Sequence, residues 1–132
     1  MALTQQYEVT WNSKFKRVRS YTGTSATAIN ETVGPITSGG VNQPFQLVEI
    51  RIMADDTPSD PENFTITLDS GAGATFDQVI YSADLSVTGI PVQNLFDENR
   101  VYGPDDKLDI DYANTGTDTV TFEIIVRVPY QI

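Results

Sequence analysis

The chain contains no cysteine and no histidine among its 132 residues. Without a thiol, it cannot form a disulfide, a thiolate nucleophile or a zinc–thiolate site. Without an imidazole, it lacks the commonest general base and the commonest transition-metal ligand. Catalysis by Ser-His-Asp, by Cys-His or by a histidine-bound metal is therefore excluded. The missing cysteines also favour synthesis in a reducing cytoplasm, because small secreted domains are often rich in disulfides.

Basic residues are scarce, with 8 Lys and Arg against 18 Asp and Glu and a net charge of −10. Because phosphate binding needs a basic surface, we expect no direct nucleic-acid partner. The N-terminal residues Met-Ala-Leu-Thr-Gln-Gln lack the basic and apolar regions of a signal peptide. No apolar run approaches the length of a membrane span, so we expect no membrane partner either.

Short stretches of alternating apolar and polar residues run through most of the chain. The clearest lies at the C-terminal end, where Leu108, Ile110 and Tyr112 alternate with charged residues before a turn and a longer alternating run. A period of two indicates half-buried strands, and we expect these two strands to form a closing hairpin. Further strands are predicted at residues 7–11, 15–21, 45–54, 64–68, 77–83 and 92–96.

Turn residues separate these stretches at intervals of roughly 8–12 residues, which is typical of a sandwich or barrel. We therefore predict an all-β fold, a single antiparallel β-sandwich of jelly-roll type with about eight strands. The length suits one domain. Residues 31–132 are expected to form the sandwich core, and residues 1–30 an N-terminal strand or extended arm of the same domain. In residues 45–54, we expect Val48, Ile50 and Ile52 to share the buried face.

Four carboxylates lie in one loop, residues 55–62. Calcium takes six to eight oxygen ligands, and loops of β-sandwiches can supply them. Asp55, Asp56, Asp60 and Glu62 are therefore calcium candidates, although the spacing does not match an EF-hand. The alternative is a solvated loop in an acidic protein, and we predict no cofactor.

A second acidic group includes Asp109 and Asp111, which the alternation places on one outer face of a strand. Such a pair could bind a cation or act as general acid and base, as carboxylate pairs do in glycosidases. The alternative is that both are simply solvated, with Lys107 on the same face partly offsetting their charge. We predict that the protein is not an enzyme.

The chain is acidic, yet half of its basic residues lie in the six consecutive positions 14–19. These residues are Lys14, Lys16, Arg17 and Arg19. One interpretation is a solvated or edge strand whose charges prevent edge-to-edge aggregation. The other is an electrostatic docking strip for an acidic neighbour, either a second copy or a larger assembly. We name these four residues as interface candidates.

Aromatic residues could form a platform for sugar rings if several of them are exposed. The candidates are Tyr7, Trp11, Tyr21, Tyr81, Tyr102, Tyr112 and Tyr130. Tyr112 and Tyr130 continue the inward-facing rows of their strands, which favours core packing for both.

The run from Gly103 to Arg127 resembles the closing segment of small jelly-roll structural proteins of tailed bacteriophages, the capsid decoration or cement proteins among them. The matching residues are Asp106, Leu108, Ile110, Tyr112, Asn114, Thr115 and 123–127. The resemblance implies a virion component that is made in the host cytoplasm and binds the major capsid protein. It also implies a homo-oligomer, with a trimer favoured, and no catalytic residue.

The function expected first is therefore a non-enzymatic virion structural protein, a capsid decoration protein that stabilises the phage head through subunit contacts. The alternative is a carbohydrate- or receptor-binding β-sandwich module of a phage tail or cell-surface apparatus. That alternative predicts exposed aromatic residues and calcium in the acidic loop.

Overall fold

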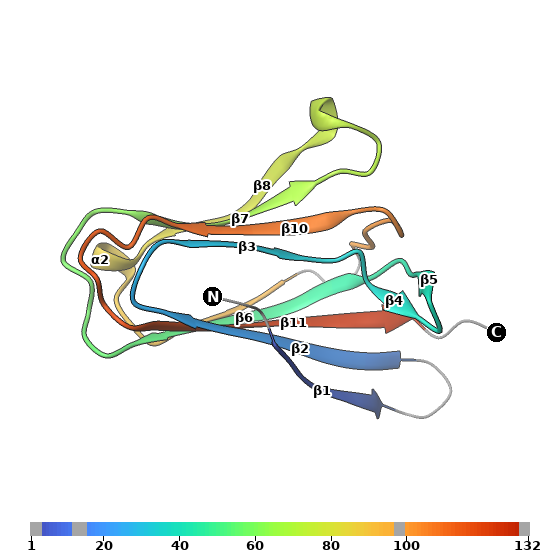
Figure 1. Ribbon diagram of the computed structural model, residues 1–132, viewed down its shortest axis with the longest axis horizontal. Helices are drawn as coiled ribbons and strands as arrows, with labels where there is room; N and C mark the ends of the chain where they lie inside the picture. The colour runs from blue at the N-terminus through green and yellow to red at the C-terminus, as the bar shows by residue number, and fades with distance from the viewer. Residues whose placement is uncertain (1–3, 12–15, 97–99, 130–132) are drawn as a thin grey trace.

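The computed structural model describes residues 4–11, 16–96 and 100–129, and these form two antiparallel β-sheets packed face to face (Figure 1). The five-stranded sheet has the order β1-β2-β11-β6-β9, and the four-stranded sheet has the order β3-β10-β7-β8. A separate small hairpin pairs β4 with β5. The predicted all-β sandwich is thus confirmed.

The strands follow the alternating stretches of the sequence closely. Those of the five-stranded sheet are β1 (Thr4–Trp11), β2 (Lys16–Ser25), β11 (Val120–Pro129), β6 (Gln46–Ala54) and β9 (Val92–Leu95). Those of the four-stranded sheet are β3 (Ile29–Val33), β10 (Lys107–Tyr112), β7 (Asn63–Asp69) and β8 (Gln78–Asp84). The smaller elements are β4 (Thr37–Ser38), β5 (Val41–Asn42), the 3-10 turn η1 (Ala74–Phe76) and the helical turn α2 (Leu85–Thr88).

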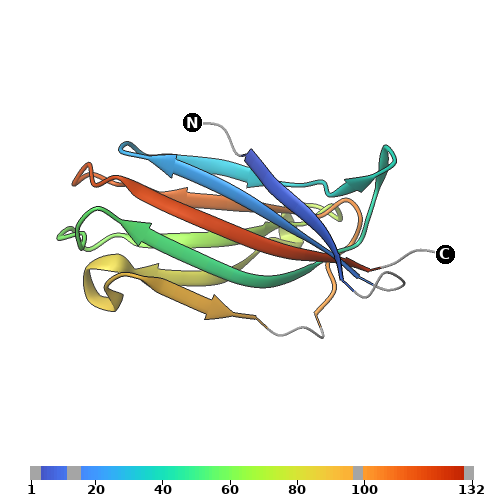
Figure 2. The same ribbon diagram turned by 90° about the horizontal axis from the view of Figure 1, so that it is seen from below.

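The strand order is that of a jelly roll. The eight main strands can be numbered 1 to 8 along the chain, starting at β2 and leaving out β4 and β5. Their order is then 1-8-3-6 in one sheet and 2-7-4-5 in the other. This is the double Greek-key arrangement, in which successive strands change layer except at the β7–β8 hairpin. Strand β1 is an addition that pairs antiparallel with β2 and widens the five-stranded sheet (Figure 2).

The core fills the space between the sheets with the inward rows of each strand. Leu108, Ile110 and Tyr112 are buried from one layer, and Phe122 and Ile124 from the other. Phe64 joins the two rows: its ring centroid lies 5.9 Å from that of Tyr112 and 5.7 Å from that of Phe122. Burial of each such side chain stabilises the fold by about 1.5–3 kcal/mol.

The prediction of a C-terminal hairpin is wrong. Strand β10 pairs with β3 and β7, whereas β11 pairs with β2 and β6 in the opposite sheet. Residues 113–119 therefore carry the chain across from one layer to the other. Asn114 and Thr117 take positive φ angles of 50° and 56° there, which is the turn chemistry that a hairpin also uses. The local sequence cannot tell the two connections apart.

The predicted face of β6 needs one correction. The register between β6 and β11 shifts at Ile125/Val126, so that Val126 lies opposite Leu47 and Ile125 opposite Glu49. Val48 is the extra residue of a β-bulge. In consequence Leu47, not Val48, joins Ile50 and Ile52 on the buried face.

Residues 22–30, the last part of the region 1–30 predicted to be a strand or an arm, contribute to both sheets. The end of β2 pairs with β11 as far as Ser25 opposite Val120. Strand β3 then starts at Ile29, which pairs with Tyr112. The segment between them is a second crossing from one layer to the other.

Candidate functional site

The basic segment does not form an edge strand, because β2 lies between β1 and β11. Arg19 is 5% exposed, and its Nη1 donates to the backbone oxygen of Thr37 at 2.5 Å. Since a buried guanidinium cannot meet a partner, Arg19 leaves the set of interface candidates. Lys16 and Arg17 begin β2, opposite Trp11 and Thr10 of β1. Lys14 lies outside the described residues.

The acidic loop, residues 55–62, is hydrogen-bonded to residues 113–119, the segment that crosses from one sheet to the other. Asp55 Oδ1 accepts from the backbone nitrogen of Thr119 at 2.9 Å. Glu62 Oε1 accepts from the backbone nitrogen of Thr115 at 3.0 Å. Bonds from backbone N–H groups to carboxylates are strong, charge-assisted interactions, so these side chains have a structural role.

The Thr115 hydroxyl contacts two carboxylates at once, with distances of 2.7 Å to Asp60 Oδ2 and 2.8 Å to Glu62 Oε2. A hydroxyl carries one hydrogen and can donate to only one of them at a time. Asp56 turns instead to its own loop and accepts from the backbone nitrogen of Thr57 at 2.8 Å. Within the described ranges, no group of three or more acidic side chains is arranged to hold a metal ion. Of the four calcium candidates, Asp60 and Glu62 thus meet at Thr115, whereas Asp55 and Asp56 bind other groups.

Asp109 and Asp111 lie on the outer face of β10, as the alternation predicts. Burial raises the pKa of Asp111 above its ordinary value, and the neighbouring charge of Asp109 raises it further. Asp109 accepts from Thr32 Oγ1 at 3.0 Å. Lys107 pairs with Asp69 at 3.6 Å. A raised carboxyl pKa is what an acid catalyst needs, but structural charge clusters also produce it.

The aromatic candidates do not form a common platform in the part of the chain with described side chains. Tyr102 and Tyr112 are buried, and Tyr21 packs against the core. Tyr81 meets Phe96 edge to face, with 5.9 Å between ring centroids. Tyr7 and Trp11 belong to β1, and Tyr130 lies outside the described residues.

A polar network that the sequence analysis missed covers the outer face of the five-stranded sheet. Arg51 bridges Glu49, at 3.2 Å, and Glu123, also at 3.2 Å. Gln93 Nε2 donates to Glu49 Oε2, and the Ser20 hydroxyl donates to Glu123 Oε2, both at 2.5 Å. The alternating charges of β6 and β11 are visible in the sequence. Only the register, which places Arg51 opposite Glu123, shows that they meet.

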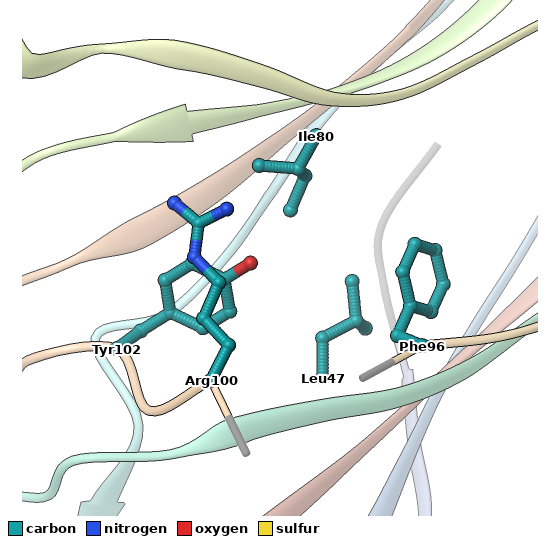
Figure 3. Close-up of a pocket in the computed structure, with 5 residues that line it drawn as sticks. All are labelled: Leu47, Ile80, Phe96, Arg100 and Tyr102. Carbon is teal, nitrogen blue, oxygen red and sulfur yellow. The ribbon is translucent and has the colours of Figure 1, made fainter. Parts of the chain in front are cut away.

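A cavity of about 120 Å³ lies between β6 of the five-stranded sheet and β8 of the four-stranded sheet (Figure 3). We call it the Tyr102 cavity, and it is lined by Leu47, Ile80, Phe96, Arg100 and Tyr102. Tyr102 is held by a bridge to Phe45, with backbone N–O distances of 3.0 and 2.7 Å. Burial raises the pKa of Tyr102, although the charge of Arg100 acts in the opposite direction.

Arg100 supplies the positive charge of this cavity. Its guanidinium carbon lies 4.9 Å from the centre of the Tyr102 ring, a cation–π arrangement. Its Nη2 donates to Gln78 Oε1 at 2.8 Å. Within the described part of the chain, it forms no ion pair with a carboxylate. An apolar wall with one cation at the rim is the chemically most distinctive feature of this side of the sandwich.

Large apolar side chains are exposed on several elements of the described part of the chain, with Val87 of α2 the most exposed at 82%. Four of the large ones lie on or beside the two edge strands, namely Phe76, Val79, Leu95 and Val101. Phe76 and Val79 are 63% and 57% exposed. Single exposed apolar residues are ordinary, and only a contiguous apolar patch marks an interaction surface.

In comparisons with protein-family models, curated proteins and solved structures, nothing matches this chain. In the described residues, no helix has the length and apolar character required to cross a membrane.

Proposed function

We propose that this protein is a non-enzymatic structural protein of a virion. Its role would be that of a capsid decoration protein, bound to the major capsid protein as a homo-oligomer. The observation that carries the proposal is the jelly-roll strand order of its two sheets. Viral capsid domains are among the proteins that use this architecture. The likeness of residues 103–127 to the closing segment of phage decoration proteins supports it independently.

The surface of the molecule fits an adhesive role. Its loop carboxylates, such as Asp55 and Glu62, bind neighbouring backbone groups and stabilise the fold. Its exposed large apolar residues include Val79 of β8, Val87 of α2 and Leu95 of β9. Protein seams that last typically bury about 1,200–2,000 Å². Such seams between subunits would resist the internal pressure of packaged DNA.

A second candidate is a carbohydrate- or receptor-binding module. Lectin domains also use the jelly roll, and the Tyr102 cavity combines apolar walls with the cation of Arg100. The burial of Tyr102 and Tyr112 counts against a sugar platform built from these rings. Since a fold alone does not determine function, the two candidates must be separated by experiment.

The deciding experiment probes virus particles, purified from a lysate of the source culture, with an antibody raised against the recombinant chain. Regular labelling of heads by immuno-electron microscopy is the expected result, and rebinding of the recombinant chain to stripped heads would support it. Labelling confined to tails, together with binding in a glycan screen, would favour the second candidate. Particles without any label would overturn the proposal.

A further inference from the structure

The walls of the Tyr102 cavity are apolar and come from both sheets. In Figure 3, Tyr102 lies on one side of the cavity, Leu47 and Phe96 lie on the other, and Ile80 lies above. Leu47 is 1% exposed and Tyr102 is 5% exposed, so both belong to the core. An apolar group that enters this space leaves water and contacts side chains that are already held by the fold, which is favourable.

The volume of the cavity, about 120 Å³, limits what it can hold. An engineered cavity of about 150 Å³ binds benzene, whereas pockets for drug-sized ligands measure about 300–1,000 Å³. The Tyr102 cavity therefore fits one small ring and not a long acyl chain. Two of its walls, Phe96 and Tyr102, are aromatic, and rings pack favourably against one another edge to face or offset. Both size and lining favour an aromatic occupant.

Two hydrogen-bond donors lie beside these apolar walls. The guanidinium carbon of Arg100 is 4.9 Å from the centre of the Tyr102 ring, and its Nη2 donates to Gln78 Oε1 at 2.8 Å. A guanidinium has five N–H donors, so most of them remain available. The hydroxyl of Tyr102 has no hydrogen-bond partner among the described residues. Because burial raises the pKa of Tyr102, this hydroxyl keeps its proton at neutral pH and can donate it.

The carboxylates that follow Tyr102 in the chain bind other groups. Asp106 accepts from the backbone nitrogens of Gly71 and Gly103 at 2.8 and 2.7 Å. Asp105 accepts from Asn42 Nδ2 at 3.1 Å. Neither carboxylate forms an ion pair with Arg100 in the described part of the chain. The charge of Arg100 is thus available to an anion from outside.

The site is already formed without a ligand. The backbone of Tyr102 is bridged to Phe45, and the two rings lie 5.3 Å apart between centroids. The side chain of Arg100 is held by Gln78 and by the Tyr102 ring. Since few groups must be ordered when a ligand binds, little of the binding free energy is lost to ordering.

We infer that the Tyr102 cavity is a binding site for a small aromatic carboxylate, with its ring against Leu47 and Ile80 and its carboxylate on Arg100. A carboxylate can accept two parallel N–H bonds from a guanidinium, which fixes its orientation. The Tyr102 hydroxyl supplies a further donor. An inorganic anion would leave the apolar walls unfilled, and a neutral ring would leave the charge of Arg100 unmatched. The inference goes beyond the proposed function and does not rest on it, because a structural protein needs no small ligand.

The test is a titration with benzoate, followed by methyl resonances in the NMR spectrum of this 14.5 kDa chain. The methyl signals of Leu47 and Ile80 should shift and saturate with a Kd of about 0.1–10 mM, as expected for so small a ligand. Benzyl alcohol, which has the ring without the charge, should bind at least about tenfold more weakly, because charge-assisted hydrogen bonds are the stronger ones. Acetate, which has the charge without the ring, should give no saturable shift of these signals.

Three variants assign the binding to the proposed contacts. Arg100→Gln should weaken benzoate binding at least about tenfold and change benzyl alcohol binding by less than about twofold. Tyr102→Phe keeps the ring and removes the hydroxyl, so benzoate binding should weaken by about two- to tenfold. Lys107→Gln is the matched control, because it removes the same charge from a residue that pairs with Asp69. It should change benzoate binding by less than about twofold. Amide spectra show that each variant keeps its fold.

Several outcomes would overturn the inference. One is the absence of a saturable shift in the wild-type chain, and another is equal binding of benzoate and benzyl alcohol. Equal weakening by Arg100→Gln and Lys107→Gln would show that only the overall charge matters. Neither the ligand comparison nor the variants involve virus particles, so the proposed function stands or falls separately by the labelling of heads.

Discussion

The side-chain amide of Asn114 joins the two crossings between the sheets: its Nδ2 donates to the backbone oxygen of Thr27 at 3.1 Å. Thr27 lies between β2 and β3, whereas Asn114 lies between β10 and β11. The same nitrogen donates to the oxygen of Asp118 at 2.9 Å, which closes its own turn. Asn114 itself is 2% exposed, so its amide depends on these partners in place of water. One residue thereby stabilises both connections at this end of the sandwich.

Replacing Asn114 by alanine should lower the free energy of unfolding by about 1–3 kcal/mol, since the hydrogen bonds of a buried amide to both connections are lost. Asparagine also tolerates its positive φ of 50° better than alanine does. The loss is measured as a lower urea midpoint. Thr27→Ala is the matched control, because it keeps the accepting backbone oxygen. A loss no greater than that of the control would contradict the assigned role.

Arg51 should matter more to stability than Lys107, although each forms an ion pair. The Glu49 partner of Arg51 is only 8% exposed, so Arg51→Met leaves a largely buried carboxylate with fewer donors. We expect a loss of about 1–3 kcal/mol in urea denaturation. The Lys107–Asp69 pair is exposed on both sides, at 39% and 37%, and Lys107→Met should cost less than about 1 kcal/mol. Equal losses would show that the network on the outer face contributes no more than a surface pair.

Asp111→Asn should raise the melting temperature at pH 7. The pKa of Asp111 is raised in the folded protein by burial and by Asp109, so its ionised form destabilises the fold. That cost is fully present above the raised pKa. It fades as the pH falls through that pKa towards the ordinary value of 3.8, where the carboxyl is protonated in both states. The variant and the wild type should therefore melt alike at about pH 3.

The control for this pH dependence is Asp69→Asn, which removes a carboxylate that is paired with Lys107. It should bring no gain in melting temperature at pH 7. A gain for Asp111→Asn that persists unchanged at low pH would contradict the electrostatic explanation.

The basic segment can be tested without disturbing the fold, provided that Arg19 is left in place. The triple change Lys14→Ala, Lys16→Ala, Arg17→Ala should leave the melting temperature nearly unchanged and weaken sedimentation with virus heads. The weakening should be larger at about 50 mM than at about 500 mM salt, because salt screens attraction between opposite charges. Arg19→Ala should instead lower the melting temperature, since it removes a buried donor to Thr37. Unchanged sedimentation by the triple variant at low salt would remove the segment from the docking surface.

The sequence by itself determined the fold class and most strand positions. Alternation along a strand is a local property, so Leu108, Ile110 and Tyr112 were assigned to the core without any knowledge of their neighbours. The lack of cysteine and histidine, likewise, excluded whole classes of chemistry from composition alone. Such conclusions need only residue identity and a period of two.

Only the tertiary structure decided which strands are neighbours and which side chains meet. The turn at residues 113–119 suits a hairpin as well as a crossing, and only the pairing of β10 and β11 with different strands distinguishes them. Arg19 has the sequence pattern of a surface cation, but the fold brings Thr37 of β4 against it and buries it. The Tyr102 cavity joins residues from positions 47 to 102. Strand pairing joins residues distant in the chain, and no local pattern encodes the choice of partner.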